Sequence, residues 1–274
     1  MSSPEPEAGR RALDANVLGQ DHRSLDRYLA GAPHLKYQRL TQAYHRMVEG
    51  ALKATSKPPS SLSVCELGAG LGLSATPWLE RQIPLTAVDP SRVMLENFQH
   101  TAAAAALKIV VSDAETFLSQ THERYDILCC VSMLHHIPDY LTMLEAAQRV
   151  IRPGGCLITF QDPLQYNRMA RGVHRVDRFF YFLWRSRQGE LRQGLRTRWR
   201  RLRRRYDSAE TADFEEYHVV RNGVDSQSIV DLLRPRFEQV IETRYWSNQS
   251  LIGQVIGDRV GLKNTFAILA TGAH

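Results

Sequence analysis

Three glycines at alternate positions follow a short apolar run early in the chain. They are Gly68, Gly70 and Gly72. The run 62–67 before them and the helix-compatible stretch 73–82 after them predict a strand, a tight turn and a helix. Glycines let the backbone approach a ligand closely, and the amino end of a helix attracts a carboxylate or a phosphate. Because Leu73 stands where a dinucleotide fingerprint requires Gly or Ala, the spacing favours an adenosine ligand other than NAD.

Carboxylates follow the next two apolar runs. The run Leu85–Val88 ends in Asp89, and an acid at the tip of the second strand accepts hydrogen bonds from ribose hydroxyls. The run 109–111 leads into Asp113, whose carboxylate can accept the adenine amino group. Asp113 also suits the N-cap of a helix over 114–118, and it can fill both roles together.

A pair of histidines follows the fourth apolar run, 125–131. They are His135 and His136. Histidine changes charge near neutral pH, so either residue can serve as a general base. Because both come directly after a predicted strand, at least one of them can face a ligand at the strand end.

Apolar runs alternate with helical patterns through this part of the chain. The runs cover 62–67, 85–88, 109–111, 125–131 and 156–160. Such alternation predicts parallel strands with right-handed crossovers, hence a doubly wound α/β sheet whose ligands gather at the carboxyl ends of the strands. The predicted strand-end residues are Gly68, Asp89, Asp113 and Val131.

Other patterns predict where helices begin and end. Apolar spacing over 25–52, broken at 31–33, indicates two amino-terminal helices that cap the ligand pocket. Pro138 suits the first turn of a helix that Gly154-Gly155 ends. The N-cap candidates are Ser91 and Asp225.

The order of these motifs resembles the class I S-adenosylmethionine-dependent methyltransferases. LHHIPD at 134–139 and RVIRPGG at 149–155 lie either side of one predicted helix, which is typical of the broad group that methylates small molecules. The resemblance covers about 61–162 and the last strands. It implies a Rossmann-like sheet of seven strands whose last two, 237–246 and 264–271, form an antiparallel hairpin. It also implies S-adenosylmethionine as the cofactor, with no metal and no covalent intermediate.

The resemblance assigns roles to further residues. Glu66 is the acid that the family motif places before the first glycine, where it can bond the loop amides or approach the methionine ammonium. Tyr37 is expected near the methionine carboxylate, or else packs in the core. The histidine pair is frequently structural in the family, with the second histidine beneath the cofactor. The other expected cofactor contacts are Ala69, Gly70, Pro90, Ala114 and Val131.

One segment carries the basic charge of the chain. The net charge is +6, yet 168–206 holds fourteen Arg against two acids, so the remainder of the chain is acidic. The alternation lapses for roughly sixty residues after Asp162, which predicts an insertion with structure of its own. It contains the aromatic run FFYFLW at 179–184. Candidate substrate contacts beside it are Tyr166, His174, Glu215, Glu216 and His218.

Four interpretations of this insertion stay open. It can be a helical lid whose aromatic side chains cover an apolar substrate. It can lie on an anionic membrane surface and reach a lipophilic substrate. It can bind RNA through arginines and stacked rings, although no separate RNA-binding module accompanies it. Its arginines can also be solvated or paired with acids elsewhere on the chain, which is compatible with the lid.

Length and composition predict the domain organisation. The 274 residues suit one domain with an insertion. The expected parts are a disordered tail (1–20), amino-terminal helices with the cofactor-binding core (21–162), the insertion on the substrate side (163–222) and the rest of the core (223–274). We expect no signal peptide and no membrane span. Four cysteines in predicted core strands favour a reduced, cytoplasmic protein without a metal site.

The sequence therefore predicts a cytoplasmic S-adenosylmethionine-dependent methyltransferase of specialised metabolism. Its acceptor is expected to be O, N or C of a small, apolar or aromatic molecule, and its candidate catalytic residues are His135 and His136. Three alternatives remain: an RNA methyltransferase, a membrane-associated enzyme for a lipophilic substrate, and a non-catalytic protein that binds the cofactor.

Overall fold

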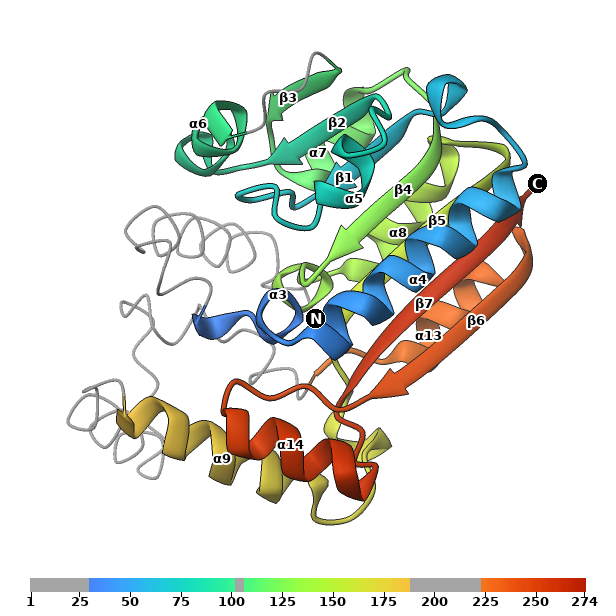
Figure 1. The fold of residues 1–274 in the computed structure, drawn as a ribbon. Helices are drawn as coiled ribbons and strands as arrows, with labels where there is room; N and C mark the ends of the chain where they lie inside the picture. Colours follow the sequence, from blue (N-terminus) through green and yellow to red (C-terminus); the bar gives the residue numbers. More distant parts are fainter. Residues whose placement is uncertain (1–29, 102–105, 188–222) are drawn as a thin grey trace, which may run out of the picture.

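Seven strands form one mixed sheet in the computed structural model, which describes residues 30–101, 106–187 and 223–274 (Figure 1). The order across the sheet is β3-β2-β1-β4-β5-β7-β6. β7 runs antiparallel to β5 and β6, whereas the other neighbouring pairs are parallel. The strands are β1 (Val64–Leu67), β2 (Leu85–Asp89), β3 (Leu107–Val111), β4 (Tyr125–Val131), β5 (Ile151–Pro163), β6 (Phe237–Tyr245) and β7 (Thr265–Ala273). The predicted doubly wound, Rossmann-like α/β sheet is confirmed.

Helices cover both faces of this sheet, and α4 lies along one face of β5 and β7 while α8 and α13 lie on the other (Figure 1). The α-helices are α3 (Pro33–Lys36), α4 (Gln38–Thr55), α5 (Thr76–Leu79), α6 (Arg92–Thr101), α7 (Ala114–Gln120), α8 (Tyr140–Arg149), α9 (Val173–Arg187), α13 (Ser226–Leu233) and α14 (Leu251–Val260). Short 3-10 turns are η1 (Pro59–Ser61), η2 (Leu134–His136) and η3 (Tyr166–Arg168).

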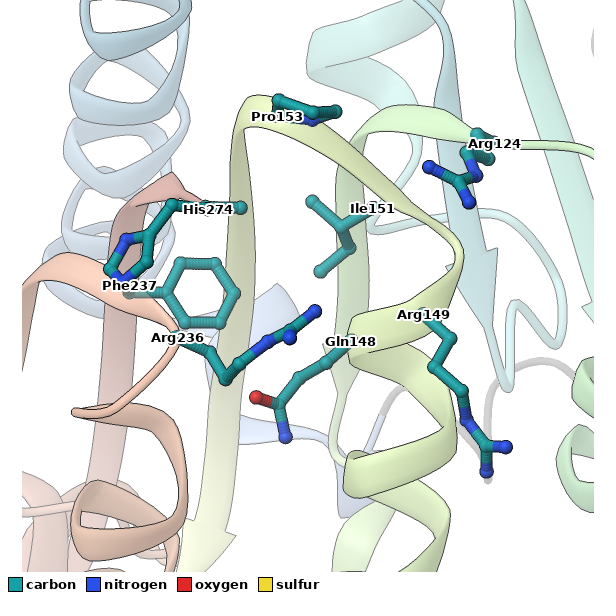
Figure 2. A pocket seen from close by; sticks show the side chains of 9 residues that line it. Arg124, Gln148, Arg149, Ile151, Pro153, Arg236, Phe237 and His274 are labelled. Atoms are coloured by element: carbon teal, nitrogen blue, oxygen red, sulfur yellow. The ribbon is translucent and has the colours of Figure 1, made fainter.

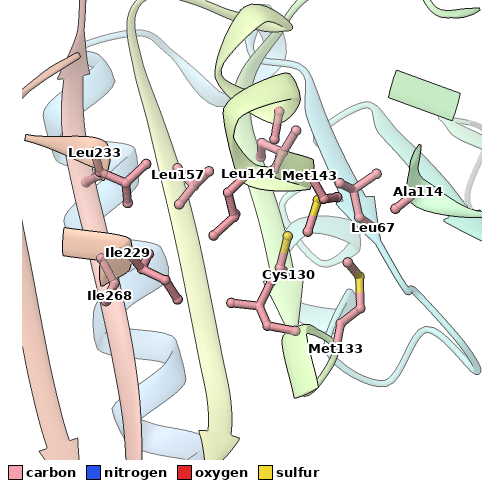
Figure 3. Packing of buried hydrophobic residues seen from close by; sticks show 14 of the residues in the cluster. Leu67, Ala114, Cys130, Met133, Met143, Leu144, Leu157, Ile229, Leu233 and Ile268 are labelled. Atoms are coloured by element: carbon pink, nitrogen blue, oxygen red, sulfur yellow. The ribbon is translucent and has the colours of Figure 1, made fainter. Parts of the chain in front are cut away.

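The two faces of the sheet bury separate hydrophobic clusters. Cys130, Leu144 and Ile229 belong to the cluster under α8 and α13 (Figure 3). Val48 of α4 and Ile158 of β5 belong to the cluster on the opposite face. β1, β2 and β4 are buried along their whole length, as expected for parallel strands that are covered on both sides.

All four cysteines of the chain lie in these central strands. They are Cys65, Cys129, Cys130 and Cys156, each a free and buried thiol. Burial raises the pKa of every one of them, because the charged thiolate is poorly solvated inside the core.

The predicted helix caps are confirmed at three positions. Ser91 Oγ accepts a hydrogen bond from the Met94 N–H at 3.2 Å at the start of α6. The Asp225 carboxylate accepts one from the Gln227 N–H at 3.1 Å at the start of α13. Asp113 caps α7 in the same way. Each side chain satisfies a backbone donor that the first helical turn leaves unpaired.

The predicted helix over 73–82 is wrong, because only the four residues of α5 are helical there. Turns continue past the glycines, with the Gly72 N–H bonded to the Ala69 carbonyl at 2.8 Å and the Ala75 N–H to the Gly72 carbonyl at 3.1 Å. These turns bring the Ser74 hydroxyl to the buried Glu66, to which it donates a hydrogen bond. The helix therefore begins too late and is too short for its amino end to bind an anion at the glycine turn.

Three other predicted boundaries also differ. α8 begins at Tyr140 rather than in the turn of Pro138, because the Asp139 carboxylate caps it by accepting from the Thr142 N–H at 3.2 Å. The helix ends at Arg149, and Gly154-Gly155 lies inside the span of β5. β6 and β7 pair antiparallel as predicted, but they are not a hairpin, since α14 lies between them in the chain.

The structure describes only some residues of the predicted amino-terminal segment and of the predicted insertion. The second amino-terminal helix is confirmed as α4, whereas the first falls largely outside the described residues. The insertion contains α9, while its later part, with Glu215, Glu216 and His218, and the tail at 1–20 lie outside them too. The predicted domain boundaries stay predictions. Within the described ranges, no helix is both long and apolar enough to cross a membrane.

Candidate active site

The strand register brings the predicted site residues to one edge of the sheet. Leu67 of β1 pairs with Val88 of β2 and with Cys130 of β4. Val131 pairs with Phe160 of β5. These strands therefore end at the same edge of the sheet, and the segments that follow them begin there. Asp89, the last residue of β2, pairs with Val111 at the end of β3. Gly68, Asp113 and His135 follow β1, β3 and β4.

The glycine turn is tight because two of its glycines have no room for a side chain. A Cβ at Gly68 would lie 2.7 Å from Met133, and one at Gly72 would lie 2.2 Å from the Phe98 ring. Gly68, Gly70 and Gly72 all have positive φ, at 70°, 51° and 70°, a region that L side chains rarely adopt. The turn is thus packed against α6 and against the segment after β4, and the N–H groups of its three glycines already donate to oxygens of the protein.

Asp89 holds this turn from the end of β2. One carboxylate oxygen accepts a hydrogen bond from the Gly70 N–H at 2.9 Å, and the other accepts one from the Ser91 N–H at 2.8 Å. The residue is 5% exposed. The binding of ribose hydroxyls, which the sequence assigns to Asp89, stays a prediction. The bond from the Gly70 N–H is a role of Asp89 that the sequence did not predict.

Glu66 is a fully buried acid beneath the glycine turn. Oε1 accepts a hydrogen bond from the Ser74 hydroxyl, whereas Oε2 has no hydrogen-bond partner among the described residues. Burial raises the pKa of Glu66 to about 7, although the bond from Ser74 opposes the shift. The buried Tyr44 hydroxyl also lacks a partner within the described chain. Burial, and then the nearby Cys129 and Glu66, raise the pKa of Tyr44.

The raised pKa of Glu66 predicts a pH-dependent stability. The folded protein keeps the Glu66 proton up to about pH 7, whereas the unfolded chain releases it at the ordinary value of 4.5. The folded state binds more protons between these values, so the free energy of unfolding falls as pH rises through this window. Glu66→Gln removes the charge and keeps the shape. Its stability relative to the unchanged protein should grow by on the order of 2 kcal/mol between pH 5 and pH 8.

Urea unfolding of both proteins without cofactor, at the two pH values, measures this difference. Glu96→Gln, at an exposed position of α6, is the matched control and should show no such growth. A difference that stays constant from pH 5 to pH 8 would contradict the buried, charge-destabilised state of Glu66.

The remaining predicted cofactor residues lie around the same edge. Asp113 Oδ1 accepts from the Thr116 N–H at 2.8 Å, which confirms its N-cap role, while its adenine role stays a prediction. The Tyr37 hydroxyl donates to the Gln249 carbonyl at 2.9 Å and so ties the start of α4 to the segment before α14. The other expected contacts are Ala69, Ala114 and Val131, all buried, and Pro90, half-buried.

His135 and Asp162 form a pair that the sequence did not reveal. His135 follows β4, Asp162 lies near the end of β5, and His135 Nδ1 is 2.8 Å from Asp162 Oδ1. The His135 backbone N–H donates to the same oxygen at 3.1 Å. Asp162 is fully buried, and the His135 side chain is 11% exposed. Because a carboxylate accepts, we assign the proton to Nδ1, which leaves the lone pair on Nε2.

The sequence contained a sign that Asp162 lies at the site, but this sign did not identify its partner. Asp162 is an acid at the end of the fifth apolar run, as Asp89 is at the end of the second. β4 and β5 are neighbours in the sheet, so an acid after one meets a histidine after the other. The second predicted base, His136, contacts His135 with ring centroids 4.0 Å apart and ring planes tilted by 44°. Of the candidate substrate contacts, Tyr166 and His174 stack on each other at 3.9 Å.

Two surface hollows lie at the other end of the sheet. Figure 2 shows one of about 380 Å³, lined by Arg124, Gln148, Arg149, Ile151, Pro153, Arg236, Phe237, Ala273 and His274. Ile151 and Phe237 are the first residues of β5 and β6, so this hollow opens at the amino ends of those strands. The second, of about 600 Å³, reaches Leu85 and Tyr125 at the amino ends of β2 and β4. Neither hollow includes a predicted site residue.

Comparison with known proteins matches the central strands to a described family. Residues 65–159 match the family model described as "Methyltransferase domain". The ubiquinone biosynthesis O-methyltransferase of Aeromonas salmonicida is 29% identical over 94 residues, which are 34% of this chain and 40% of that one. The chain thus spans less than half of the length of this relative.

Solved structures share the fold over nearly the whole chain. The N-methyltransferase NodS of Bradyrhizobium japonicum, in complex with S-adenosylhomocysteine, superposes with a TM-score of 0.54 at 12% identity, covering 95% of this chain and 96% of that one. Magnesium protoporphyrin IX methyltransferase of Synechocystis, with bound S-adenosylmethionine, gives 0.52 at 12% identity, covering 99% and 100%. The predicted methyltransferase domain is confirmed over residues 65–159, and the solved structures share its fold.

Proposed function

We propose that this chain transfers the methyl group of S-adenosylmethionine to a hydroxyl of a small apolar or aromatic molecule, with His135 as the general base. The observation that carries the proposal is the contact between His135 Nδ1 and the buried Asp162 at 2.8 Å. A hydroxyl is a weak nucleophile until a base takes its proton, and a histidine with a fixed tautomer is suited to that role. The name of the Aeromonas relative, an O-methyltransferase, supports an oxygen acceptor.

The residues at the strand ends fit the cofactor. Glu66 Oε2 is a buried polar atom without a partner in the described chain, and such an atom suits the ammonium end of a methionine. We assign Asp89 to the ribose and Asp113 to the adenine. We assign Tyr37 to the methionine carboxylate, to which its hydroxyl would donate in place of the Gln249 carbonyl. When bound, the cofactor supplies a methyl group activated by its sulfonium. The lining assigned to it is Gly68, Ala69, Gly70, Pro90, Ala114 and Val131.

The chain's own residues then supply position and proton transfer. His135 Nε2 accepts the proton of the acceptor hydroxyl, and Asp162 stabilises the imidazolium that results, because its carboxylate lies against Nδ1. Exclusion of water and alignment of donor and acceptor provide the rest of the rate enhancement. An oriented base supports an enzyme over a non-catalytic binding protein. The RNA alternative depends on arginines that lie mostly outside the described residues.

Calorimetry with S-adenosylmethionine and S-adenosylhomocysteine tests the cofactor assignment. Both should bind the folded protein with micromolar or tighter affinity, because the site assigns charged partners to both ends of each ligand. A panel of alkylated phenols and catechols with methyl-labelled cofactor then tests the acceptor class. Folded protein that binds neither ligand would refute the proposal, and methylation of RNA but of no phenol would replace the acceptor.

A further inference from the structure

Helix α14 presents its large aliphatic side chains outward. Between 41% and 66% of each is exposed: Leu251, Ile252, Val255, Ile256 and Val260. Their spacing of one and four residues places them on one stripe of the helix. A surface helix ordinarily turns such a stripe toward the core. The orientation of α14 is therefore the reverse of the usual one.

The inward face of α14 fixes this orientation. A Cβ at Gly253 would lie 2.7 Å from Phe180 of α9, and one at Gly257 would lie 2.2 Å from the Trp246 indole. Gln254 accepts a hydrogen bond from the Asn248 N–H at 2.8 Å and donates one to the Trp246 carbonyl at 3.2 Å. Only glycine fits at this close approach, so the aliphatic side chains cannot take the inward positions.

Helix α9 packs beside α14 (Figure 1), and it also carries exposed apolar side chains. Phe179 is 57% exposed, and Phe182 and Leu183 are each 37% exposed. They lie three to four residues apart and share one side of α9. We call these three residues and the five of α14 the α9–α14 face. Eight large apolar side chains on two packed helices form more exposed apolar surface than scattered single residues do.

The charges around the α9–α14 face are cationic. The exposed cations on the two helices and just after them are Arg175, Arg178, Arg259 and Lys263. The two acids on these helices, Asp177 and Asp258, are already engaged by other side chains of the protein. Asp177 accepts hydrogen bonds from the Asn248 and Asn264 amides at 2.9 Å each, and Asp258 pairs with Arg39 at 3.1 Å. Among the described residues no ion pair with these four cations is found, and an apolar surface with such cations complements an apolar partner that carries anions.

We propose that the α9–α14 face lies on the surface of a membrane that contains anionic lipids. The aliphatic and phenyl groups enter the headgroup boundary, and the cations contact lipid phosphates. A second copy of this chain fits less well, because a two-fold contact would bring the same cations together.

Membrane contact would also place the candidate active site near the bilayer. Gln249, two residues before α14, accepts the hydrogen bond of Tyr37 at 2.9 Å. A lipophilic acceptor can then pass from the bilayer to the carboxyl edge of the sheet. This consequence rests on the proposed function, whereas the membrane contact itself does not.

Vesicle flotation with the full chain tests the contact without cofactor or acceptor. The protein should float with vesicles of phosphatidylcholine that contain about 30% phosphatidylglycerol, and only weakly with phosphatidylcholine alone. Ile252→Ser with Ile256→Ser should lower the partition coefficient by about tenfold or more, since two inserting side chains lose their apolar surface. Val93→Ser with Ile241→Ser is the matched control, because these residues are 44% and 45% exposed on α6 and β6. The control pair should change the partition coefficient less than twofold, as roughly expected for surface substitutions.

Each alternative occupant gives a different result. No flotation with either vesicle overturns the proposal. Flotation that the α14 variant does not weaken assigns binding to the arginines alone and overturns the role of α14. Light scattering that shows a dimer, converted to a monomer by the α14 variant and with no flotation, identifies a second copy as the occupant. Melting temperatures of both variants should match the unchanged protein, because the substituted side chains are exposed.

Discussion

His135→Gln is expected to lower kcat by about 10²- to 10⁴-fold, the contribution typical of a positioned general base. Glutamine fills much of the same space and can donate to Asp162, but it cannot take a proton. The affinity for S-adenosylmethionine should change little, because His135 lies after β4 and is assigned to the acceptor side rather than to the cofactor. Initial rates on the best acceptor of the phenol panel, and calorimetry with the cofactor, measure the two quantities.

Asp162→Asn separates a positioning role from a structural one. The amide cannot fix the Nδ1 proton as a carboxylate does, so kcat should fall while the KM for the acceptor and the cofactor affinity stay near their original values. A purely structural role would lower the melting temperature and weaken cofactor binding as well. His136→Gln is the matched control for the two neighbouring histidines. If His136→Gln lowers kcat more than His135→Gln does, His136 rather than His135 is the general base.

Asp89→Ala is expected to weaken the binding of S-adenosylmethionine by roughly 2 to 4 kcal/mol, the range for the loss of charge-assisted hydrogen bonds. The ribose would lose its carboxylate partner. The substitution also frees the Gly70 and Ser91 amides, which Asp89 now holds at 2.9 and 2.8 Å, so the glycine turn loosens at the same time. Isothermal calorimetry at a temperature where circular dichroism shows a folded protein gives the change in Kd.

Asp126→Ala is the control for general destabilisation. Asp126 is also a buried acid, and it accepts from the Ser63 N–H at 2.9 Å and pairs with Lys57 and Arg152 at the amino end of β4. Its loss should lower stability and leave the cofactor Kd of the folded protein unchanged. If Asp126→Ala weakens cofactor binding as much as Asp89→Ala does, the loss of affinity comes from general destabilisation and not from a lost contact with the ribose. An unchanged Kd in Asp89→Ala would place the ribose elsewhere.

The sequence predicted the parts of the fold that depend on apolar periodicity and on caps. The strands β1, β2, β4 and β5 appear in the sequence as apolar runs because the residues of those runs are buried, whereas β3, at the edge of the sheet, is only partly buried. Ser91, Asp113 and Asp225 cap helices because short polar side chains satisfy free amides. The doubly wound topology alone predicted that Gly68, Asp89, Asp113 and His135 lie together at the carboxyl ends of the strands.

The missed features depend on contacts between distant segments. Asp162 acquires its partner only because β4 and β5 are neighbours in the sheet, which the sequence spacing of 27 residues does not show. The shortening of α5 reflects a hydrogen bond from Ser74 to Glu66, a local competition that helix propensity ignores. The reversed orientation of α14 depends on the Trp246 and Phe180 side chains, against which only glycine fits.

Because the four cysteines are buried, the folded protein should react very slowly with thiol reagents. Cys65, Cys129, Cys130 and Cys156 are inaccessible and poorly ionised. A single cysteine introduced at an exposed surface position would therefore react first and carry a fluorophore or spin label selectively. In the unmodified chain, the slow labelling of the four native thiols would report how often the central strands open.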